Sequence, residues 1–226
     1  MTWTIVWVGF VTAIASYFLG CINGAIIVSD QFYHEDIRKK GSGNAGLTNF
    51  YRVYGKRHIL LVLAIDILKA ALGVYIGAFL FRWQFDQWTL GKYWAALWVV
   101  LGHNYPCVHA FRGGKGILCA GTLLLLLDWR IALVGFATFI LLTALTGFVS
   151  LGSVTGAATF PVTTFFVFRE QDPKYLMFAI SLLTAAIVIW AHRGNIQRLS
   201  EGRERKFQFH HLEKKTESNE NETQTE

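Results

Sequence analysis

Seven long apolar segments constrain the fold of this chain more than any other feature of its sequence. They cover residues 3–28, 59–81, 93–111, 116–127, 131–150, 154–168 and 175–191. Most of them approach or exceed the roughly 20 residues that a helix needs to cross a membrane. Hydrophobic residues make up 53% of the 226 residues and charged residues only 16%. This balance argues against a soluble domain, a disordered chain and a fibrous protein, and it predicts an all-α polytopic membrane protein.

The fourth segment is the shortest, and the distribution of charge bears on whether it crosses. Its twelve residues would form a helix of about 18 Å, short of the hydrocarbon core of about 30 Å. With seven crossings and an outer N-terminus, 15 Lys and Arg residues lie on the cytoplasmic side and five outside. Without the fourth crossing the numbers are eleven and nine. Because basic residues accumulate in cytoplasmic loops, we expect seven crossings, an outer N-terminus and a cytoplasmic C-terminus.

The same reasoning bounds the domain organisation and the partners. We expect one transmembrane domain over residues 1–212 and a polar, disordered tail over residues 213–226, where no apolar residue occurs. The net charge of +6 is explained by cytoplasmic loops beside a lipid bilayer, and we expect no nucleic-acid partner. Three scattered cysteines and the lack of an acidic cluster predict no metal site. We also expect no cofactor.

Two charged residues interrupt the second apolar segment. Asp66 and Lys69 are three positions apart and so share one face of a helix. Charges inside a membrane are costly and often mark a functional site. The alternative is an ion pair that locks the packing of the helices. In the third segment, we interpret His103 as a buried histidine with satisfied hydrogen bonds rather than a reactive group.

The first polar island, residues 41–52, is rich in glycine and in hydrogen-bonding side chains. It has G-x-G-x-x-G spacing, but no strand precedes it, so a dinucleotide site is not indicated. Glycines let backbone N–H groups converge on an anion, and an Arg side chain suits phosphate. The alternative is a plain turn between two helices. The predicted binding residues are Gly41, Ser42, Gly43, Asn44, Thr48, Asn49 and Arg52.

Two further islands carry cationic and titratable groups. Residues 113–116, Gly-Gly-Lys-Gly, precede an expected helix, whose N-terminus favours anions. In the last island, His192, Asn195 and Arg198 recur every third residue and can share a helix face. A basic membrane anchor is the alternative for that island.

All three islands lie on the expected cytoplasmic side. Together they predict a site for phosphorylated substrates at the membrane surface. A transporter for a phosphorylated solute is the competing class, but its polar groups would gather near the midplane of the bilayer.

The three islands resemble a known family. The sequences GSGNAGLTNFYR at 41–52, GHNYPCVHAFRGGKG at 102–116 and HRGNIQRLSEGRE at 192–204 are similar, in order, to the signature motifs of bacterial acyl-phosphate:glycerol-3-phosphate acyltransferases. The resemblance covers residues 5–207. It implies a seven-span enzyme of the bacterial plasma (inner) membrane whose active site faces the cytoplasm. Its reaction would move a fatty acyl group from acyl phosphate to the sn-1 hydroxyl of glycerol 3-phosphate, which gives lysophosphatidic acid and phosphate early in phospholipid biosynthesis.

The resemblance also implies roles for individual residues. It implies that Ser42 and Arg52 serve activity and glycerol 3-phosphate binding, and that His192 and Asn195 are catalytic. The acyl-phosphate site would be lined by Gly113, Gly114 and Gly116, with Lys115 near the phosphate, and Glu204 would support the structure. Two roles for His192 stay open: a general base, or a group that orients the hydroxyl while the leaving phosphate takes the proton. Direct transfer is favoured over a covalent intermediate on Ser42.

Overall fold

The protein is built from helices. The computed structural model describes residues 2–206, and the expected tail at 213–226 lies outside them. Within that range every regular element is helical, which confirms the predicted all-α class. The elements are α1 (Thr2–Cys21), α2 (Gly24–Tyr33), η1 (Ile37–Lys39), α3 (Leu47–Tyr54), α4 (Ile59–Phe85), α5 (Trp88–Asn104), η2 (Cys107–His109), α6 (Ile117–Leu127), α7 (Trp129–Thr146), α8 (Val149–Val167), α9 (Lys174–Ala191) and α10 (Arg193–Ser200).

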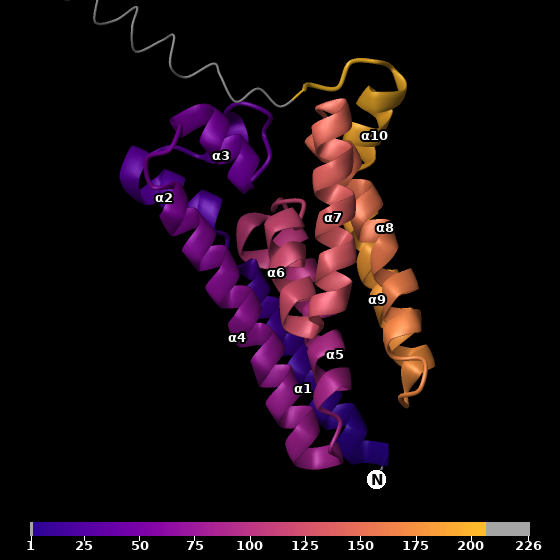
Figure 1. Ribbon diagram of the computed structural model, residues 1–226. Helices are drawn as coiled ribbons and strands as arrows, with labels where there is room; N and C mark the ends of the chain where they lie inside the picture. The colour runs from indigo at the N-terminus through magenta and orange to yellow at the C-terminus, as the bar shows by residue number, and fades with distance from the viewer. Residues whose placement is uncertain (1, 207–226) are drawn as a thin grey trace, which may run out of the picture.

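The long helices form two groups with α6 between them. Helices α1, α4 and α5 pack against one another, α8 packs against both α7 and α9, and α6 contacts helices of both groups. Figure 1 shows α2, α3 and α10 at one end of the bundle, while α1 begins at the other end. The elements that carry the first and third polar islands therefore lie at the same end.

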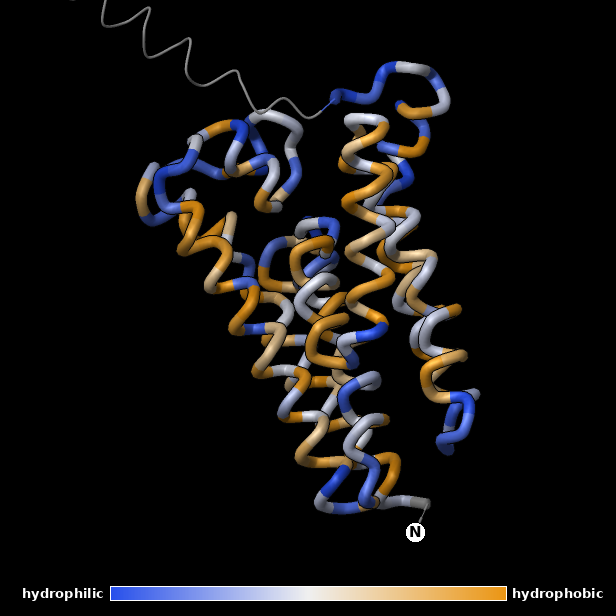
Figure 2. Tube along the Cα trace, viewed as in Figure 1, coloured by the Kyte–Doolittle hydropathy of each residue, from blue (hydrophilic) through white to orange (hydrophobic). Residues whose placement is uncertain are grey.

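Five segments are long and apolar enough to cross a membrane. They are residues Trp3–Tyr33, which include α1 and α2, and helices α4, α7, α8 and α9. Large apolar side chains such as Leu60, Phe79 and Leu133 are exposed on these helices, as suits contact with lipid. Hydrophobic residues are frequent along the long helices in Figure 2, and hydrophilic residues are frequent around α3 and α10.

Helices α5 and α6 are shorter than these five segments. Helix α5 has 17 residues, and α6 has 11, or about 17 Å of length. In Figure 1, α6 stops well short of the end at which α4 and α5 meet.

Several helix boundaries differ from the ends of the expected apolar segments. The segment expected at 3–28 is two helices, because the chain leaves helical geometry at Ile22 and Asn23. Helix α5 ends at Asn104, before Pro106, since proline disfavours a helical conformation in the residue before it. Helix α7 ends at Thr146, and Gly147 follows it with a φ of 78°, in the left-handed region that glycine adopts readily. Helix α8 then begins at Val149, earlier than residue 154.

The buried pair Asp66–Lys69 holds the two halves of the first segment together. Lys69 Nζ lies 2.8 Å from Asp66 Oδ1, and both side chains are 1% exposed. Asp66 Oδ1 accepts a hydrogen bond from the Gly24 amide at the start of α2, while Lys69 donates to the Ile22 carbonyl just after α1. A carboxylate at a helix N-terminus and an ammonium at a C-terminus both complement the helix dipole. The geometry thus supports the ion-pair interpretation.

The pair also contacts α5. His103 Nδ1 lies 2.7 Å from Lys69 Nζ, and the imidazole is buried. Lys69 therefore joins α1, α4 and α5 at one point, and His103 has a polar partner, as expected from the sequence.

Removing one partner of this pair will destabilise the protein strongly. We expect Lys69→Ala to lower the free energy of unfolding by about 3–5 kcal/mol, because Asp66 then stays buried without a counter-charge. Lys174→Ala is the control: this half-buried lysine donates only to the nearby Arg169 carbonyl, and its loss should cost less than about 0.5 kcal/mol. Denaturant titration in mild detergent measures both values. Equal stability of the two variants would show that the pair does not hold the helix break.

Candidate active site

A single cavity brings the three polar islands together. Its volume is about 1410 Å³, and residues from all three islands line it. The predicted site residues in its lining are Gly41, Ser42, Gly43, Asn44, Thr48, Asn49, Arg52, Lys115, Gly116, His192, Asn195, Arg198 and Glu204.

The part of the cavity between α6, α7 and α8 is lined mainly by apolar side chains. Leu123 of α6, Phe136 and Phe139 of α7 and Phe160 of α8 line this part. The cavity therefore suits a molecule with a charged head and a hydrocarbon tail. Among residues 2–206, no three His, Cys, Asp or Glu side chains are grouped so that they could hold a metal ion.

Asn49 shapes the glycine-rich loop of the first island. Its side chain accepts a hydrogen bond from the Ser42 amide at 2.8 Å and donates to the carbonyls of Lys40 and Asn44. Gly41 has a φ of 59°, and a Cβ there would lie 2.3 Å from Asn49 Oδ1. We predicted substrate binding by Asn49, but in the structure its amide is engaged by the loop backbone.

The loop also rests on the break between α1 and α2. Asn23 caps α2 through Ile26, and its Nδ2 donates to the Ala45 carbonyl at 3.1 Å. Ser42 and Arg52 are exposed and line the cavity, and no described residue forms a hydrogen bond with the hydroxyl or the guanidinium. The helix break thus places both groups at the cavity.

Gly113 and Gly114 lie behind the cavity rather than in its lining. Their amides donate to the carbonyls of Asn104 and His103. A Cβ on Gly114 would lie 2.2 Å from His103 Nε2, and one on Gly113 would lie 2.0 Å from the His103 carbonyl oxygen. In the structure these two glycines let the backbone pack closely on His103, and their N–H groups donate to backbone carbonyls, so a lining role for them at the acyl-phosphate site stays a prediction.

A chain of hydrogen bonds connects the second and third islands. Lys115 Nζ donates to Asn195 Oδ1 at 2.5 Å, and Asn195 Nδ2 donates to Glu204 Oε1 at 2.6 Å. Arg198 Nε and Ser150 Oγ each donate to the Glu204 carboxylate at 2.8 Å. Partial burial alone would raise the pKa of Glu204, but these hydrogen bonds lower it below its ordinary value. Glu204 is thus an ionised acceptor that fixes its neighbours, which agrees with the expected supporting role.

The sequence did not single out Ser150 as a site residue. It lies 54 positions before Glu204, and no local spacing connects the two. Ser150 lies in the first turn of α8, and the packing of α8 places its hydroxyl beside the Glu204 carboxylate.

His192 is buried at the junction of α9 and α10. Burial, together with the charge of Lys115, lowers its pKa to about 4, so the ring is neutral at pH 7. Its Nδ1 lies 2.8 Å from the Val188 carbonyl. A neutral ring must donate its proton to that carbonyl, which leaves Nε2 as a hydrogen-bond acceptor. His192 can therefore accept a hydrogen bond from a hydroxyl group.

The polar end of the cavity is cationic. Five cations line the cavity: Arg52, Lys115, Arg193, Arg198 and Arg205. The carboxylates in the lining are those of Glu204 and of Asp66, which is paired with Lys69. Burial and the charges of Arg198 and Arg52 lower the pKa of Lys115 to about 8. Most Lys115 side chains remain protonated at pH 7, and these cations attract phosphate groups.

The pKa of Lys115 can be measured by the pH dependence of its reactivity. We expect labelling of Lys115 by an amine reagent, followed by mass spectrometry, to rise with a midpoint near pH 8, with exposed Lys56 as the reference. Arg198→Gln removes a neighbouring positive charge and should move the midpoint upward. A midpoint near the ordinary value of 10.5 would contradict the electrostatic description.

Comparisons with known proteins agree with this geometry. The family model described as glycerol-3-phosphate acyltransferase matches residues 10–202. A protein named glycerol-3-phosphate acyltransferase from Clostridioides difficile (strain 630) is 40% identical over 197 residues, which cover 87% of this chain and 94% of the relative. One with the same name from Thermoanaerobacter sp. (strain X514) is 38% identical over 196 residues, with the same coverage.

Two solved structures share the fold. Crystal structures of PlsY (YgiH), described as an integral membrane glycerol 3-phosphate acyltransferase, match with TM-scores of 0.75 and 0.73. The first is the glycerol 3-phosphate form, is 30% identical, and covers 88% of this chain and 96% of that chain. The second is the lysophosphatidic acid form, is 29% identical, and covers 88% and 95%. The chain described here belongs to the glycerol-3-phosphate acyltransferase family of integral membrane enzymes.

Proposed function

We propose that this acyltransferase takes its acyl group from acyl phosphate and transfers it directly to the sn-1 hydroxyl of glycerol 3-phosphate. The products are lysophosphatidic acid and phosphate. The reaction takes place in the cavity described above, on the cytoplasmic face of the bacterial plasma membrane.

One observation carries the proposal: the cationic groups and the apolar helix walls line the same cavity. Acyl phosphate combines a phosphate with a hydrocarbon chain, and glycerol 3-phosphate brings a second phosphate. Lys115, Arg52 and Arg198 supply the positive charge for both phosphates. The walls formed by α6, α7 and α8 offer apolar contact for the chain.

The chemistry needs alignment and charge neutralisation more than a strong base. Acyl phosphate is a mixed anhydride, so the bond between its carbonyl carbon and the bridging oxygen breaks as the hydroxyl oxygen attacks the carbon. The enzyme must align the two substrates and stabilise the developing oxyanion. In our proposal Ser42 and Arg52 hold glycerol 3-phosphate, and Lys115, aimed by Asn195, holds the phosphate that leaves.

The properties of His192 favour an orienting role. A group with a pKa of about 4 is a weak proton acceptor at pH 7, since general bases work best near the operating pH. We propose that Nε2 accepts a hydrogen bond from the sn-1 hydroxyl and directs its oxygen toward the carbonyl. The departing phosphate then takes the proton.

We also propose seven membrane crossings, with an outer N-terminus and a cytoplasmic C-terminus. The five long apolar segments support five crossings, and α5 and the short α6 supply the other two. The distribution of 15 basic residues on one side and five on the other supports this orientation. The cationic end of the cavity then faces the cytoplasm. Phosphorylated substrates can reach the cavity from that side.

The purified enzyme should acylate labelled glycerol 3-phosphate with acyl phosphate and not with acyl-CoA or acyl-carrier protein. Ser42→Ala and His192→Ala should each lower kcat/KM by about a hundredfold or more, because each removes a group that aligns the acceptor. Ser200→Ala is the control for Ser42, since this exposed serine only donates to the Gln197 carbonyl.

Two results would contradict the proposal. Turnover with a thioester would mean that the donor is misassigned. Full activity of both variants in folded, monodisperse samples would mean that the acceptor lies elsewhere in the cavity.

The orientation can be tested by labelling single cysteines in intact cells. In a variant whose native cysteines are replaced, Asp86→Cys between α4 and α5 should react with a membrane-impermeant maleimide from outside. Lys56→Cys, between α3 and α4, should react only after the membrane is permeabilised. The reverse pattern would place the cavity on the outer face.

A further inference from the structure

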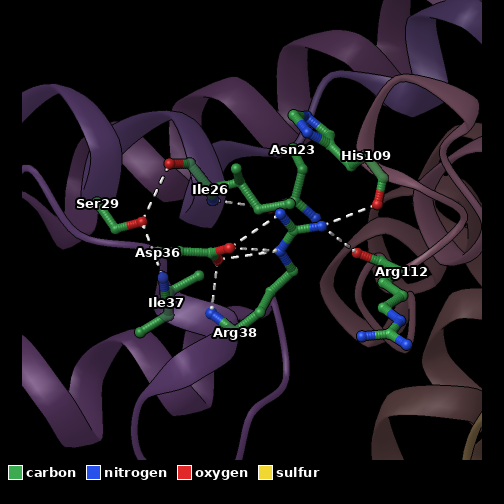
Figure 3. A network of polar contacts seen from close by, with 8 residues as sticks. All are labelled: Asn23, Ile26, Ser29, Asp36, Ile37, Arg38, His109 and Arg112. Atoms are coloured by element: carbon green, nitrogen blue, oxygen red, sulfur yellow. Dashed lines mark hydrogen bonds and ion pairs between the residues drawn. The ribbon is translucent and has the colours of Figure 1, made fainter.

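Two residues just before the glycine-rich loop reach across to the segment that carries Lys115. Asp36 caps the start of η1 and Arg38 lies within it, and neither belongs to the three polar islands of the sequence. Arg38 Nη1 donates to the His109 carbonyl at 2.8 Å and to the Arg112 carbonyl at 3.3 Å. Figure 3 shows the Arg38 guanidinium between Asp36 and these two carbonyls.

Asp36 fixes the guanidinium in this position. Arg38 Nε and Nη2 donate to Asp36 Oδ1 and Oδ2, each at 2.9 Å. Asp36 Oδ1 also accepts the backbone N–H of Arg38 at 2.9 Å. The hydrogen bonds from Arg38 lower the pKa of Asp36 below its ordinary value, so the carboxylate is ionised at pH 7. A two-pronged ion pair restricts the arginine geometrically as well as electrostatically.

On one side, η1 and the glycine-rich loop form a single unit. Asn49 Nδ2 donates to the Ile37 and Lys40 carbonyls, and the same amide accepts the Ser42 N–H. Ser29 accepts the Ile37 N–H and donates to the Ile26 carbonyl, which fastens this unit to α2 (Figure 3). These hydrogen bonds couple the position of Arg38 to the position of the loop that carries Ser42.

On the other side, the Arg38 contacts lie directly before the Lys115 segment. Arg112 is three residues before Lys115, and the amides of Gly113 and Gly114 tie the intervening backbone to α5. Arg38 thus joins the loop of Ser42 to the strip of backbone that presents Lys115. It does not line the cavity.

We propose that Asp36 and Arg38 form a clasp that sets the distance between the acceptor-binding loop and the donor-binding segment, so that Arg38 is a positioning residue for acyl transfer. The assignment of the two loops rests on the proposed function. Each loop keeps its own internal hydrogen bonds without the clasp, so each substrate still binds. What is lost is the alignment of hydroxyl and carbonyl, and small errors in alignment are costly in rate.

The chain contains a matched control for this pair. Asp128 and Arg130 have the same Asp-x-Arg spacing: Arg130 donates its backbone N–H and Nε to Asp128 Oδ1, and its Nη2 to Oδ2. This second pair lies at the junction of α6 and α7, and the Arg130 guanidinium contacts no second loop in the described structure. The Asp128–Arg130 pair therefore has the same ion-pair geometry as Asp36–Arg38 but does not connect two loops.

The test compares steady-state acyl transfer by the full-length enzyme with acyl phosphate and glycerol 3-phosphate. We expect Arg38→Ala to lower kcat by about tenfold to a hundredfold, with the KM of each substrate changed by less than about threefold. Arg38→Lys keeps the positive charge but not the forked guanidinium, so its kcat should lie between that of the original enzyme and that of Arg38→Ala. Arg130→Ala should keep kcat within about twofold of the original.

Chemical rescue separates positioning from a general loss of folded enzyme. Guanidinium chloride at a concentration below denaturation should restore part of the kcat of Arg38→Ala, and sodium chloride at the same concentration should not. A missing guanidinium can be replaced from solution, whereas misfolded protein cannot.

The outcomes are distinct. Unchanged kcat in Arg38→Ala, an equal loss in Arg130→Ala, or a loss that guanidinium does not restore would each overturn the clasp. A rise in one KM with kcat unchanged would also overturn it, because the residue would then serve binding alone. Failure of the unsubstituted enzyme to use acyl phosphate would instead refute the proposed donor.

Discussion

The buried Asp66–Lys69 pair is the interaction on which the rest of the structure depends. Desolvating two charges costs more than their mutual attraction returns unless both find further partners. Here the carboxylate caps the start of α2 and the ammonium caps the end of α1, so each charge also satisfies backbone groups that a helix break leaves unpaired. In a membrane such groups have no water to bind. The pair therefore permits a break in an apolar segment, and the break frees Asn23 to hold the loop of the first island at Ala45.

The same lysine extends the connection to the second island. Lys69 contacts His103, and the backbone at Gly114 passes so close to that ring that no Cβ fits between them. Lys115 follows directly and reaches Asn195. A continuous set of packed and hydrogen-bonded groups thus runs from the centre of the bundle to the cationic end of the cavity. The loops that meet at the cavity are separated by long stretches of chain, so their relative placement rests on these tertiary contacts.

The cavity carries an excess of positive charge, which suits ligands that contain phosphate. Cationic side chains outnumber the two carboxylates in the lining: Asp66 is paired with Lys69, and Glu204 is occupied by Asn195, Ser150 and Arg198. The excess positive charge is therefore not neutralised internally and is available to phosphate groups. Burial keeps His192 neutral beside these cations, with its proton on the side of the Val188 carbonyl. A neutral acceptor among cations can orient a hydroxyl without competing for the phosphates.

The sequence by itself determined the helical class, the three polar islands and most of the polar residues that the islands bring to the cavity, because apolar segment length and residue chemistry are local properties. Tertiary structure decided the rest. The helix break at Asn23 depends on partners at positions 45 and 66, which no periodicity reveals. Gly113 and Gly114 were expected to bind substrate, but their conformation is set by the contact with His103. Arg38 and Ser150 act on carbonyls and a carboxylate 54 or more positions away. Their roles appear only once packing brings distant segments together, since hydrogen-bond partners are chosen by distance in space and not by distance along the chain.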